Sequence, residues 1–454
     1  MPNLKTKNID EIFNKKNLWQ TYINVESEMS QAQAKVGIIP QWAADIISKK
    51  ASLELIGSKN IEKTYRKSKS LILSIITEFS KVCGEAGEFL HWGGTTRNIV
   101  DTGYTLLLRE SHRQILNELS ISLLKLSEMC LKHSSTPMVA RTFGQNALPI
   151  SFGFKIAGWI ENLTRVNQRF KDIESRVFSL HFGGAVGAMH GFGEKGYEFT
   201  EVLSKRLGFA NTLVHNRVSK DKFIEYLISL TLLGMSIGHI AKEINLLMSQ
   251  SISELSENIS KNQISSSTMP HKLNPILISE VLSHSNLLRA KTPGLIELGM
   301  PQHEGDSSID KSLEVMIEET TILSINLLIK FNDLIDNINV NTQTMKENLY
   351  LSKDYIASEN LMLQLAKNIG RQQSHKLIQN IINKSFLENQ SVIENLQNDQ
   401  RILKHMSKED IKFSLDPLNY LGQSKIISKK ASSLAKKISK MIQKRILSPS
   451  LEVI

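Results

Sequence analysis

The 454-residue chain contains few of the residues that interrupt helices or crosslink a fold. Its 10 prolines and 24 glycines leave long stretches without either residue, which favours long helices over many short strands. Its two cysteines, Cys83 and Cys130, are too few for a disulfide framework, and no C-x-x-C spacing is present. A reducing cytoplasm is therefore the simplest expectation for its localisation.

Long apolar runs are also scarce. The most apolar run, residues 223–241, contains Glu225 and His239, so we expect a helix buried in a bundle rather than a membrane span. The N-terminal stretch MPNLKTKNIDEIF is polar and has no apolar signal core. No membrane partner is expected from these features.

Basic residues outnumber acidic ones, and the net charge is +10. Residues 425–445 carry eight basic side chains and no acidic one, interleaved with apolar residues. This pattern predicts an amphipathic terminal helix with a solvated basic face. Attraction of a small anionic substrate is the second interpretation and nucleic acid the third, so no nucleic-acid partner is expected.

Apolar residues recur at spacings of three and four over several long stretches, as in amphipathic helices. These stretches are residues 18–38, 99–133, 150–182, 219–260 and 310–338. A stretch of 30 residues forms a helix of about 45 Å. Helices of that length with apolar residues on several sides must pack together, so we predict a long-helix bundle. Its broad apolar faces favour an oligomer, without fixing the number of chains.

Polar joints separate these helices, and functional groups often lie on such loops. In HWGGTTRN (residues 91–98), Thr95 and Thr96 precede a long helix and could bind a carboxylate or phosphate, but plain helix capping is an alternative. In VARTFGQNALP (residues 139–149), Thr142, Gln145 and Asn146 leave the same two interpretations open.

The stretch SSSTMPHKLNP (residues 265–275) is the most specific of the joints. A serine acts as a base only when its proton is removed and its oxyanion is stabilised, and Lys272 lies six residues from Ser266. Lys272 and Asn274 could instead bind a carboxylate and stabilise the enolate formed beside it. A polar surface loop remains the alternative.

The same stretch resembles the signature loop of the fumarase/aspartase superfamily, G-S-S-x-M-x-x-K-x-N. Ser265 replaces the leading glycine, and the matching residues are Ser266, Ser267, Met269, Lys272 and Asn274. HWGGTTRNIVDT resembles H-x-G-x-T-S-x-D-x-x-D-T, and RTFGQNALPISFGFK resembles R-T-H-G-Q-x-A-x-P-x-T-F-G. NVESEMSQAQAKVGIIP and residues 358–378 are similar to the branch that contains adenylosuccinate lyase and 3-carboxy-cis,cis-muconate cycloisomerase, and the resemblance spans roughly residues 15 to 440.

The resemblance implies an all-α fold of three helical regions. These would be an N-terminal helical domain (residues 1–98), a central long-helix bundle with the signature loop (residues 99–345) and a C-terminal helical domain (residues 346–454). It further implies a homotetramer with a twenty-helix core, whose active sites each combine three chains. The implied reaction is anti β-elimination on a succinyl group, or the related cycloisomerisation, with a small dicarboxylate substrate and no metal or organic cofactor.

The resemblance also implies roles for individual residues. Ser266 would be the base, and Lys272 and Asn274 would bind a substrate carboxylate and stabilise the enolate-like intermediate. The residues expected to bind substrate are Thr95, Thr96, Arg97, Thr142, Gln145, Ser267, Met269 and Asn274.

The chain departs from the family pattern where a proton donor is expected. Phe143 and Asn146 occupy the positions at which family members carry a histidine. Four other loop histidines are candidates for the acid, namely His91, His190, His271 and His303, and His91 is the first choice. A leaving group that needs no acid is another possibility.

Two further departures concern the substrate. Gly305 in HEGD replaces an arginine expected to bind substrate, and Asn98 replaces the usual aspartate of the first motif. No R-H-D segment precedes the first loop. We therefore expect a lyase that eliminates an amine from a substituted succinate. The alternatives are lactonisation of the 3-carboxy-cis,cis-muconate type and a non-catalytic, dicarboxylate-binding helical scaffold.

Overall fold

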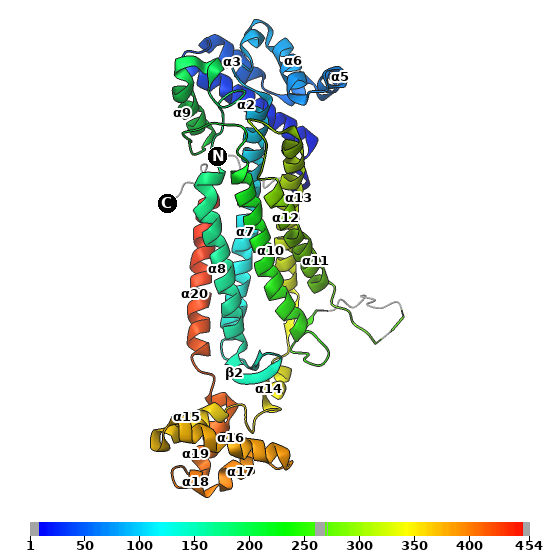
Figure 1. Cartoon of the computed structure of the whole chain (residues 1–454). Coiled ribbons are helices and arrows are strands. Elements are labelled where there is room, and N and C mark those ends of the chain that lie inside the picture. Colours follow the sequence, from blue (N-terminus) through cyan, green and yellow to red (C-terminus); the bar gives the residue numbers. More distant parts are fainter. Residues whose placement is uncertain (1–8, 259–267, 270, 448–454) are drawn as a thin grey trace.

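The computed structural model of the chain describes residues 9–258, 268–269 and 271–447. The molecule is elongated, with a long helix bundle between two groups of shorter helices (Figure 1). The fold class is helical, as predicted.

The N-terminal group lies at one end of the bundle (Figure 1). It comprises α1 (Ile9–Ile12), α2 (Lys15–Lys35), α3 (Gln41–Lys50), α4 (Leu53–Ile56), α5 (Ser58–Ser68), α6 (Leu71–Cys83) and the 3-10 helix η1 (Gly84–Phe89). The longest of these, α2, begins where the Asn14 side chain accepts a hydrogen bond from the backbone N–H of Asn17 at 2.9 Å. Helix α9 (Gly196–Leu207), preceded by η2 (His190–Lys195), packs against α2 at this end.

The bundle contains the five longest helices of the described chain together with two shorter ones. They are α7 (Thr96–Lys132), α8 (Phe152–Val177), α10 (Asp221–Leu247), α11 (Leu277–Ala290), α13 (Ser307–Asp336) and α20 (Ser424–Ile446), with the short α12 (Thr292–Glu297) between α11 and α13. Helix α10 ends 13 residues before the predicted limit of residue 260, because the chain turns at Ser249–Ser253. Among the described residues, α10 alone is long and apolar enough to span a membrane, and 72% of its most apolar window is buried inside the protein.

Short strands close the other end of the bundle. Strands β1 (Pro137–Thr142) and β2 (Gln145–Ser151) form an antiparallel hairpin in which Thr142 pairs with Gln145. Strands β3 (Leu255–Glu257) and β4 (Ile338–Val340) pair with each other in a second antiparallel sheet. In the chain, β3 follows α10 and β4 follows α13. The joint at residues 139–149 is therefore a hairpin rather than an irregular loop.

The C-terminal group has a hydrophobic core of its own, built from Leu361, Leu365, Ile378, Leu396 and Leu415 with their neighbours. Its elements are α14 (Thr342–Tyr350), α15 (Ser358–Ile369), α16 (Arg371–Leu387), α17 (Val392–Asn398), α18 (Gln400–Leu403), α19 (Lys408–Leu415) and η3 (Pro417–Asn419).

Within the predicted C-terminal region of residues 346–454, α20 returns to the bundle and packs on α7 and α8 (Figure 1). Small side chains permit this close packing: the hydroxyl oxygens of Ser127 and Ser432 lie 3.0 Å apart, as do those of Ser120 and Ser439. The lysines of α20 are exposed, as predicted for a basic face. The buried side is made largely of serines, however, and the apolar Ile426, Leu434 and Met441 are exposed.

Candidate active site

His91 is held by a buried carboxylate. It follows η1 in a left-handed backbone conformation (φ 58°), and its Nδ1 donates to Glu26 Oε1 on α2 at 2.6 Å. Glu26 is 1% exposed, whereas the His91 side chain is 20% exposed. Burial lowers the pKa of His91, but the Glu26 carboxylate outweighs burial and raises this pKa above its usual value. His91 is thus an oriented imidazole that retains a proton more readily than a free one.

Thr95 and Thr96 lie at the start of α7. Thr95 is the N-cap residue, and its backbone N–H donates to Asn98 Oδ1 at 3.2 Å. The same Asn98 oxygen accepts from the Gly184 N–H at 3.1 Å, which ties the loop at residues 91–98 to the loop at residues 181–189. Thr96 is exposed at the positive end of this 37-residue helix, a position that suits an anion.

Arg97, by contrast, is engaged within the chain. Its guanidinium pairs with Asp101, with Glu314 at 2.5 Å and with Asp310 at 3.4 Å. Lys220 bridges the two aspartates at 2.9 and 2.8 Å. Burial raises the pKa of Asp101, but Arg97 and Lys220 lower it below its ordinary value. The buried cluster holds the start of α7 against α13, so binding of substrate by Arg97 stays a prediction.

Thr142 and Gln145 flank the tip of the β1–β2 hairpin. Phe143 and Gly144 form the two-residue turn with φ of 53° and 75°, the backbone of a type I′ turn. Phe143 is fully exposed, and so are its neighbours at the tip. The hairpin is fixed near its tip by Arg141, whose guanidinium binds both oxygens of Glu254 at 2.6 and 3.1 Å.

The signature loop is only partly within the described chain. Ser266 and Ser267 lie outside the described residues, so their predicted roles are not tested. Met269, Lys272 and Asn274 are described, and all three are exposed.

Glu257 anchors the end of this loop. Its carboxylate accepts hydrogen bonds from three successive backbone N–H groups at the start of α11, those of Ile276 (2.9 Å), Leu277 (3.1 Å) and Ile278 (2.8 Å). A carboxylate is stabilising at the positive end of a helix. The chain segment that carries Lys272 and Asn274 therefore ends at a fixed point.

The predicted site residues fall into two groups at opposite ends of the bundle. His91, Thr95 and Arg97 lie at the start of α7, whereas Thr142 and Gln145 lie beyond its other end. A helix of 37 residues is about 55 Å long. The described residues 271–275 of the signature loop precede α11, away from the start of α7 (Figure 1). One chain alone does not bring the two groups together.

The other candidate acids lack the setting of His91. His190, His271 and His303 are exposed, and among the described residues only His91 of the four pairs with a carboxylate. Within the same part of the chain, no group of three or more His, Cys, Asp or Glu residues is placed to hold a metal ion.

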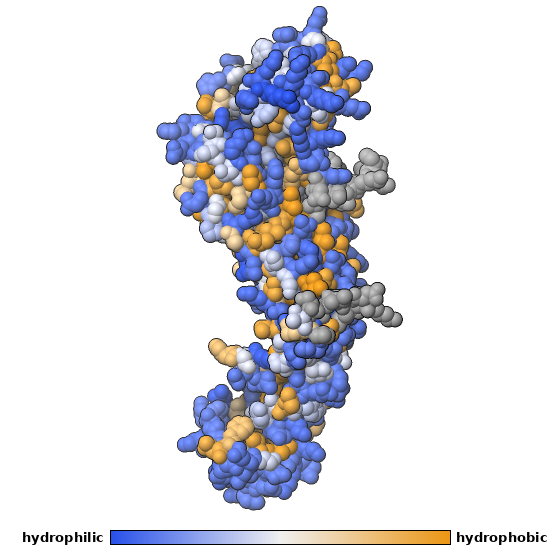
Figure 2. Space-filling model, turned by 90° about the vertical axis from the view of Figure 1, so that its right-hand side faces the viewer, coloured by the Kyte–Doolittle hydropathy of each residue, from blue (hydrophilic) through white to orange (hydrophobic). Residues whose placement is uncertain are grey.

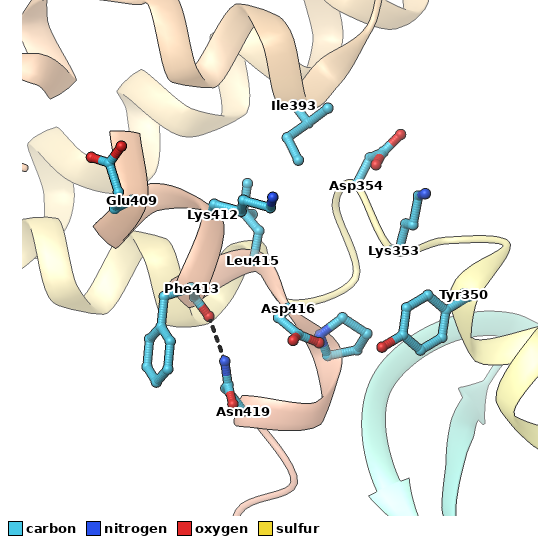
Figure 3. Close-up of a pocket in the computed structure, with 11 residues that line it drawn as sticks. Tyr350, Lys353, Asp354, Ile393, Glu409, Lys412, Phe413, Leu415, Asp416 and Asn419 are labelled. Carbon is cyan, nitrogen blue, oxygen red and sulfur yellow. Dashed lines mark hydrogen bonds between the residues drawn. The ribbon is translucent and has the colours of Figure 1, made fainter. Parts of the chain in front are cut away.

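A pocket of about 590 Å³ lies in the C-terminal group (Figure 3). Tyr350, Lys353 and Phe413 line it, and the Asn419 side chain donates to the Phe413 carbonyl at 3.0 Å beside it. None of the predicted site residues contributes to this pocket.

Sequence reasoning missed Glu26 and Glu257. Glu26 lies on the buried side of α2 with Tyr22, Ile23 and Met29. A charged residue on an otherwise apolar helical face was the available signal, because a buried carboxylate needs a partner. Glu257 gave no such signal, since its three partners are backbone groups about twenty residues away.

The fold is that of a helical protein with polar loops at both ends of a long bundle. A family profile described as Lyase matches residues 2–285, and one described as Adenylosuccinate lyase C-terminus matches residues 354–431. The chain belongs to the fumarase/aspartase superfamily, in the branch of adenylosuccinate lyase and 3-carboxy-cis,cis-muconate cycloisomerase. It is a lyase of that superfamily.

Individual relatives agree with this assignment. The chain is 31% identical to the adenylosuccinate lyase of Pyrococcus horikoshii, over 92% of this chain and 94% of the relative. It is 30% identical to the N-acetyl-S-(2-succino)cysteine lyase of Dickeya dadantii, over 93% of both chains. The crystal structure of the 3-carboxy-cis,cis-muconate lactonizing enzyme from Pseudomonas putida superposes with a TM-score of 0.84 at 26% identity, covering 95% of this chain and 97% of that one.

Proposed function

We propose that the protein eliminates a substituent from C2 of a succinate, cleaving a C–N bond and releasing fumarate. Ser266 would take the proton from C3, and the electrons of that C–H bond would form the double bond as the amine departs. Lys272 and Asn274 would bind the carboxylate next to the forming carbanion, where positive charge and hydrogen-bond donors lower the barrier.

The His91–Glu26 pair is the observation that carries this proposal. An amine leaves readily only when it is protonated, and Phe143 and Asn146 provide no acid at the usual histidine positions. The raised pKa of His91 allows Nε2 to deliver a proton near neutral pH, while Nδ1 stays bonded to Glu26. Glu26 then stabilises the orientation of the ring throughout the reaction.

The two separated groups of residues support an assembly of several chains. We propose a homotetramer in which the start of α7 from one chain meets the hairpin and the signature loop of others. Thr95, Thr96, Thr142 and Gln145 would then bind the substrate carboxylates from different chains.

A thiol is the second candidate for the leaving group. The relatives include lyases named for N-acetyl-S-(2-succino)cysteine, at 30% and 31% identity over more than 90% of their length. A thiol has a pKa of about 8.5, so it departs as a thiolate with little need for an acid. The absence of histidine at positions 143 and 146 fits such a substrate equally well.

A panel of three substrates tests the proposal. Adenylosuccinate, N-acetyl-S-(2-succino)cysteine and 3-carboxy-cis,cis-muconate would be assayed with the purified protein, and fumarate release would be followed by its ultraviolet absorbance. Elimination predicts fumarate from one of the first two and a loss of about 10²- to 10⁴-fold in Ser266→Ala. Lactone formation alone would establish the cycloisomerase alternative, and binding without turnover would establish the scaffold.

A further inference from the structure

Arg217 lies against the backbone of Gly305. A Cβ atom added at Gly305 would lie 2.9 Å from Arg217 Nη2, 3.1 Å from Cζ and 3.3 Å from Nε. Such distances are shorter than ordinary van der Waals contact, so a side chain at position 305 would displace the Arg217 guanidinium from the place that it occupies. Arg217 belongs to the loop before α10 and Gly305 to the loop before α13. The Arg217 side chain therefore lies where a side chain at position 305 would begin.

The charge of Arg217 is weakly compensated within the described chain. Its one ion pair, Nη2 to Asp310 Oδ2, is 3.9 Å long. Asp310 is already bound by Lys220 at 2.8 Å and by Arg97 at 3.4 Å, so it has little charge left for a third cation. Arg217 Nε is buried and makes no hydrogen bond to any described residue. The guanidinium nevertheless reaches solvent, because 24% of the side chain is exposed.

The position of Arg217 is also fixed. The Lys220 ammonium donates to the Arg217 carbonyl at 2.9 Å and pairs with Asp101 on α7. Asn216, its neighbour, packs on Gly187, where an added Cβ would approach Asn216 Cα to 2.6 Å. The loop at residues 181–189 is in turn bonded to Asn98 at the start of α7. Arg217 therefore stands at the same end of the bundle as His91, Thr95 and Thr96.

We propose that Arg217 binds a carboxylate of the substrate, and that Gly305 keeps the space which this guanidinium needs. The inference rests on the proposed elimination from a succinate. A partly exposed, under-compensated guanidinium on a fixed backbone is well suited to a bidentate contact with a carboxylate. The missing arginine at position 305 is then replaced in space by residue 217, supplied from a different loop.

Kinetics of Arg217→Met test the proposal, since methionine keeps much of the side-chain length but not the charge. We expect KM for N-acetyl-S-(2-succino)cysteine or adenylosuccinate, whichever is turned over, to rise about 10- to 100-fold, as for loss of a charged hydrogen bond, with kcat changing much less. Arg217→Lys should recover part of this loss. The control is Arg206→Met, which removes an arginine paired with Glu28 on the surface and should leave KM unchanged.

Moving the arginine separates substrate binding from a structural role. Gly305→Arg should impair the enzyme in the presence of Arg217, because two guanidinium groups would compete for one space. In Arg217→Ala/Gly305→Arg, however, KM should return to within about tenfold of the wild-type value. The remaining difference is what one imperfectly placed contact would cost in affinity. Failure of this double variant to improve on Arg217→Ala, at equal thermal stability, would overturn the assignment.

Two substrates locate the carboxylate. N-acetyl-S-(2-succino)cysteine carries one on its leaving group, and the S-(2-succino) derivative of N-acetylcysteamine does not. If Arg217→Met raises KM for both substrates and weakens inhibition by fumarate, the arginine contacts the succinyl half. If it raises KM for the first substrate alone, the arginine contacts the leaving group.

Normal KM values in an active Arg217→Met enzyme refute the inference only. A wild-type protein that neither binds fumarate in calorimetry nor releases it from any substrate refutes the proposed function and the inference together.

Discussion

A histidine in a polar loop titrates near pH 6.5 unless its surroundings favour one of its two charge states. For His91 the surroundings act in opposite directions, since burial disfavours the imidazolium and the Glu26 carboxylate at 2.6 Å favours it. The carboxylate prevails, and it also fixes which ring nitrogen faces outward. A single buried residue on α2 thus gives a loop histidine the two properties that an acid catalyst needs, a proton near neutral pH and a fixed direction.

The pH dependence of stability follows from this pair. Because the pKa of His91 is raised in the folded protein, its contribution to stability is fully present below the unfolded value of about 6.5. The contribution is lost as the pH rises through the folded pKa. We expect wild type to exceed His91→Gln in free energy of unfolding most clearly near pH 6, and the difference to shrink towards alkaline pH in urea titrations. His190→Gln, which alters an exposed histidine, should show no such trend.

The Glu26 carboxylate should also set how kcat/KM varies with pH. In Glu26→Gln the pKa of His91 should fall, because the attraction is removed and burial remains. The alkaline limb of the kcat/KM profile should therefore move to lower pH, and the His91 ring signals in NMR should titrate at correspondingly lower pH. An unmoved limb together with a lowered His91 pKa would assign the acid to another group.

At the scale of single elements, the signature loop depends on how α11 begins. Glu257 binds three N–H groups there and lies outside the loop itself. We expect Glu257→Ala to cost about 1–3 kcal/mol of unfolding free energy and to reduce kcat/KM, since the loop would lose its fixed end. Hydrogen exchange should accelerate in the first turn of α11. Glu161→Ala, which removes a surface pair with Arg165 on α8, should have neither effect.

The β1–β2 hairpin exposes an aromatic ring at its turn. Phe143 adopts a left-handed conformation that is unfavourable for a bulky residue, and none of the described residues covers its ring. Asparagine suits the first position of a type I′ turn, so Phe143→Asn should retain the hairpin. We expect kcat/KM to fall at least tenfold nonetheless, because the ring would be lost from a site on another chain. Unchanged kinetics would place the tip outside the active site.

The elements differ in how far the sequence predicted them. The starts of the long bundle helices α7, α8, α10 and α13 were predictable within a few residues, because their apolar periodicity is local. The end of α10 was not, since the chain turns 13 residues before the predicted limit, and α11 was not predicted. The hairpin was not, since RTFGQNALP contains turn residues that a helix-to-helix joint would also contain, and the register depends on Arg141 meeting Glu254 more than a hundred residues later. The docking of α20 on α7 depends likewise on serines from distant segments. Of the site, the loops could be identified from the sequence, but their buried partners Glu26 and Glu257 could not.

At the scale of the whole molecule, the exposed apolar residues of the bundle favour assembly of several chains. Apolar side chains are spread over the bundle and are sparser at its ends (Figure 2). On α10 to α13 the exposed apolar residues include Met235, Leu246, Leu287, Ile296 and Val315. Exposed apolar residues of this kind favour burial against a partner chain, so we expect an oligomer in solution. Light scattering would show whether it is the tetramer proposed above.

Shared sites can be detected by mixing inactive chains. If His91 and Ser266 act in one site but come from different chains, Ser266→Ala and His91→Asn subunits should restore each other when they are unfolded and refolded together. Each site then draws both residues independently from an equal mixture, so about a quarter of the sites should be intact in a symmetric oligomer. Each variant refolded alone should stay inactive.

A matched pair of variants provides the control for this experiment. His91→Asn and Thr95→Val alter the same loop, four residues apart, and every site takes that loop from a single chain. A mixture of these two should gain no activity, because each loop carries one substitution or the other. Equal recovery in both mixtures would show that subunit exchange alone, rather than sharing of sites, explains the signal. Recovery confined to the first mixture requires a site that joins the start of α7 to a signature loop on another chain.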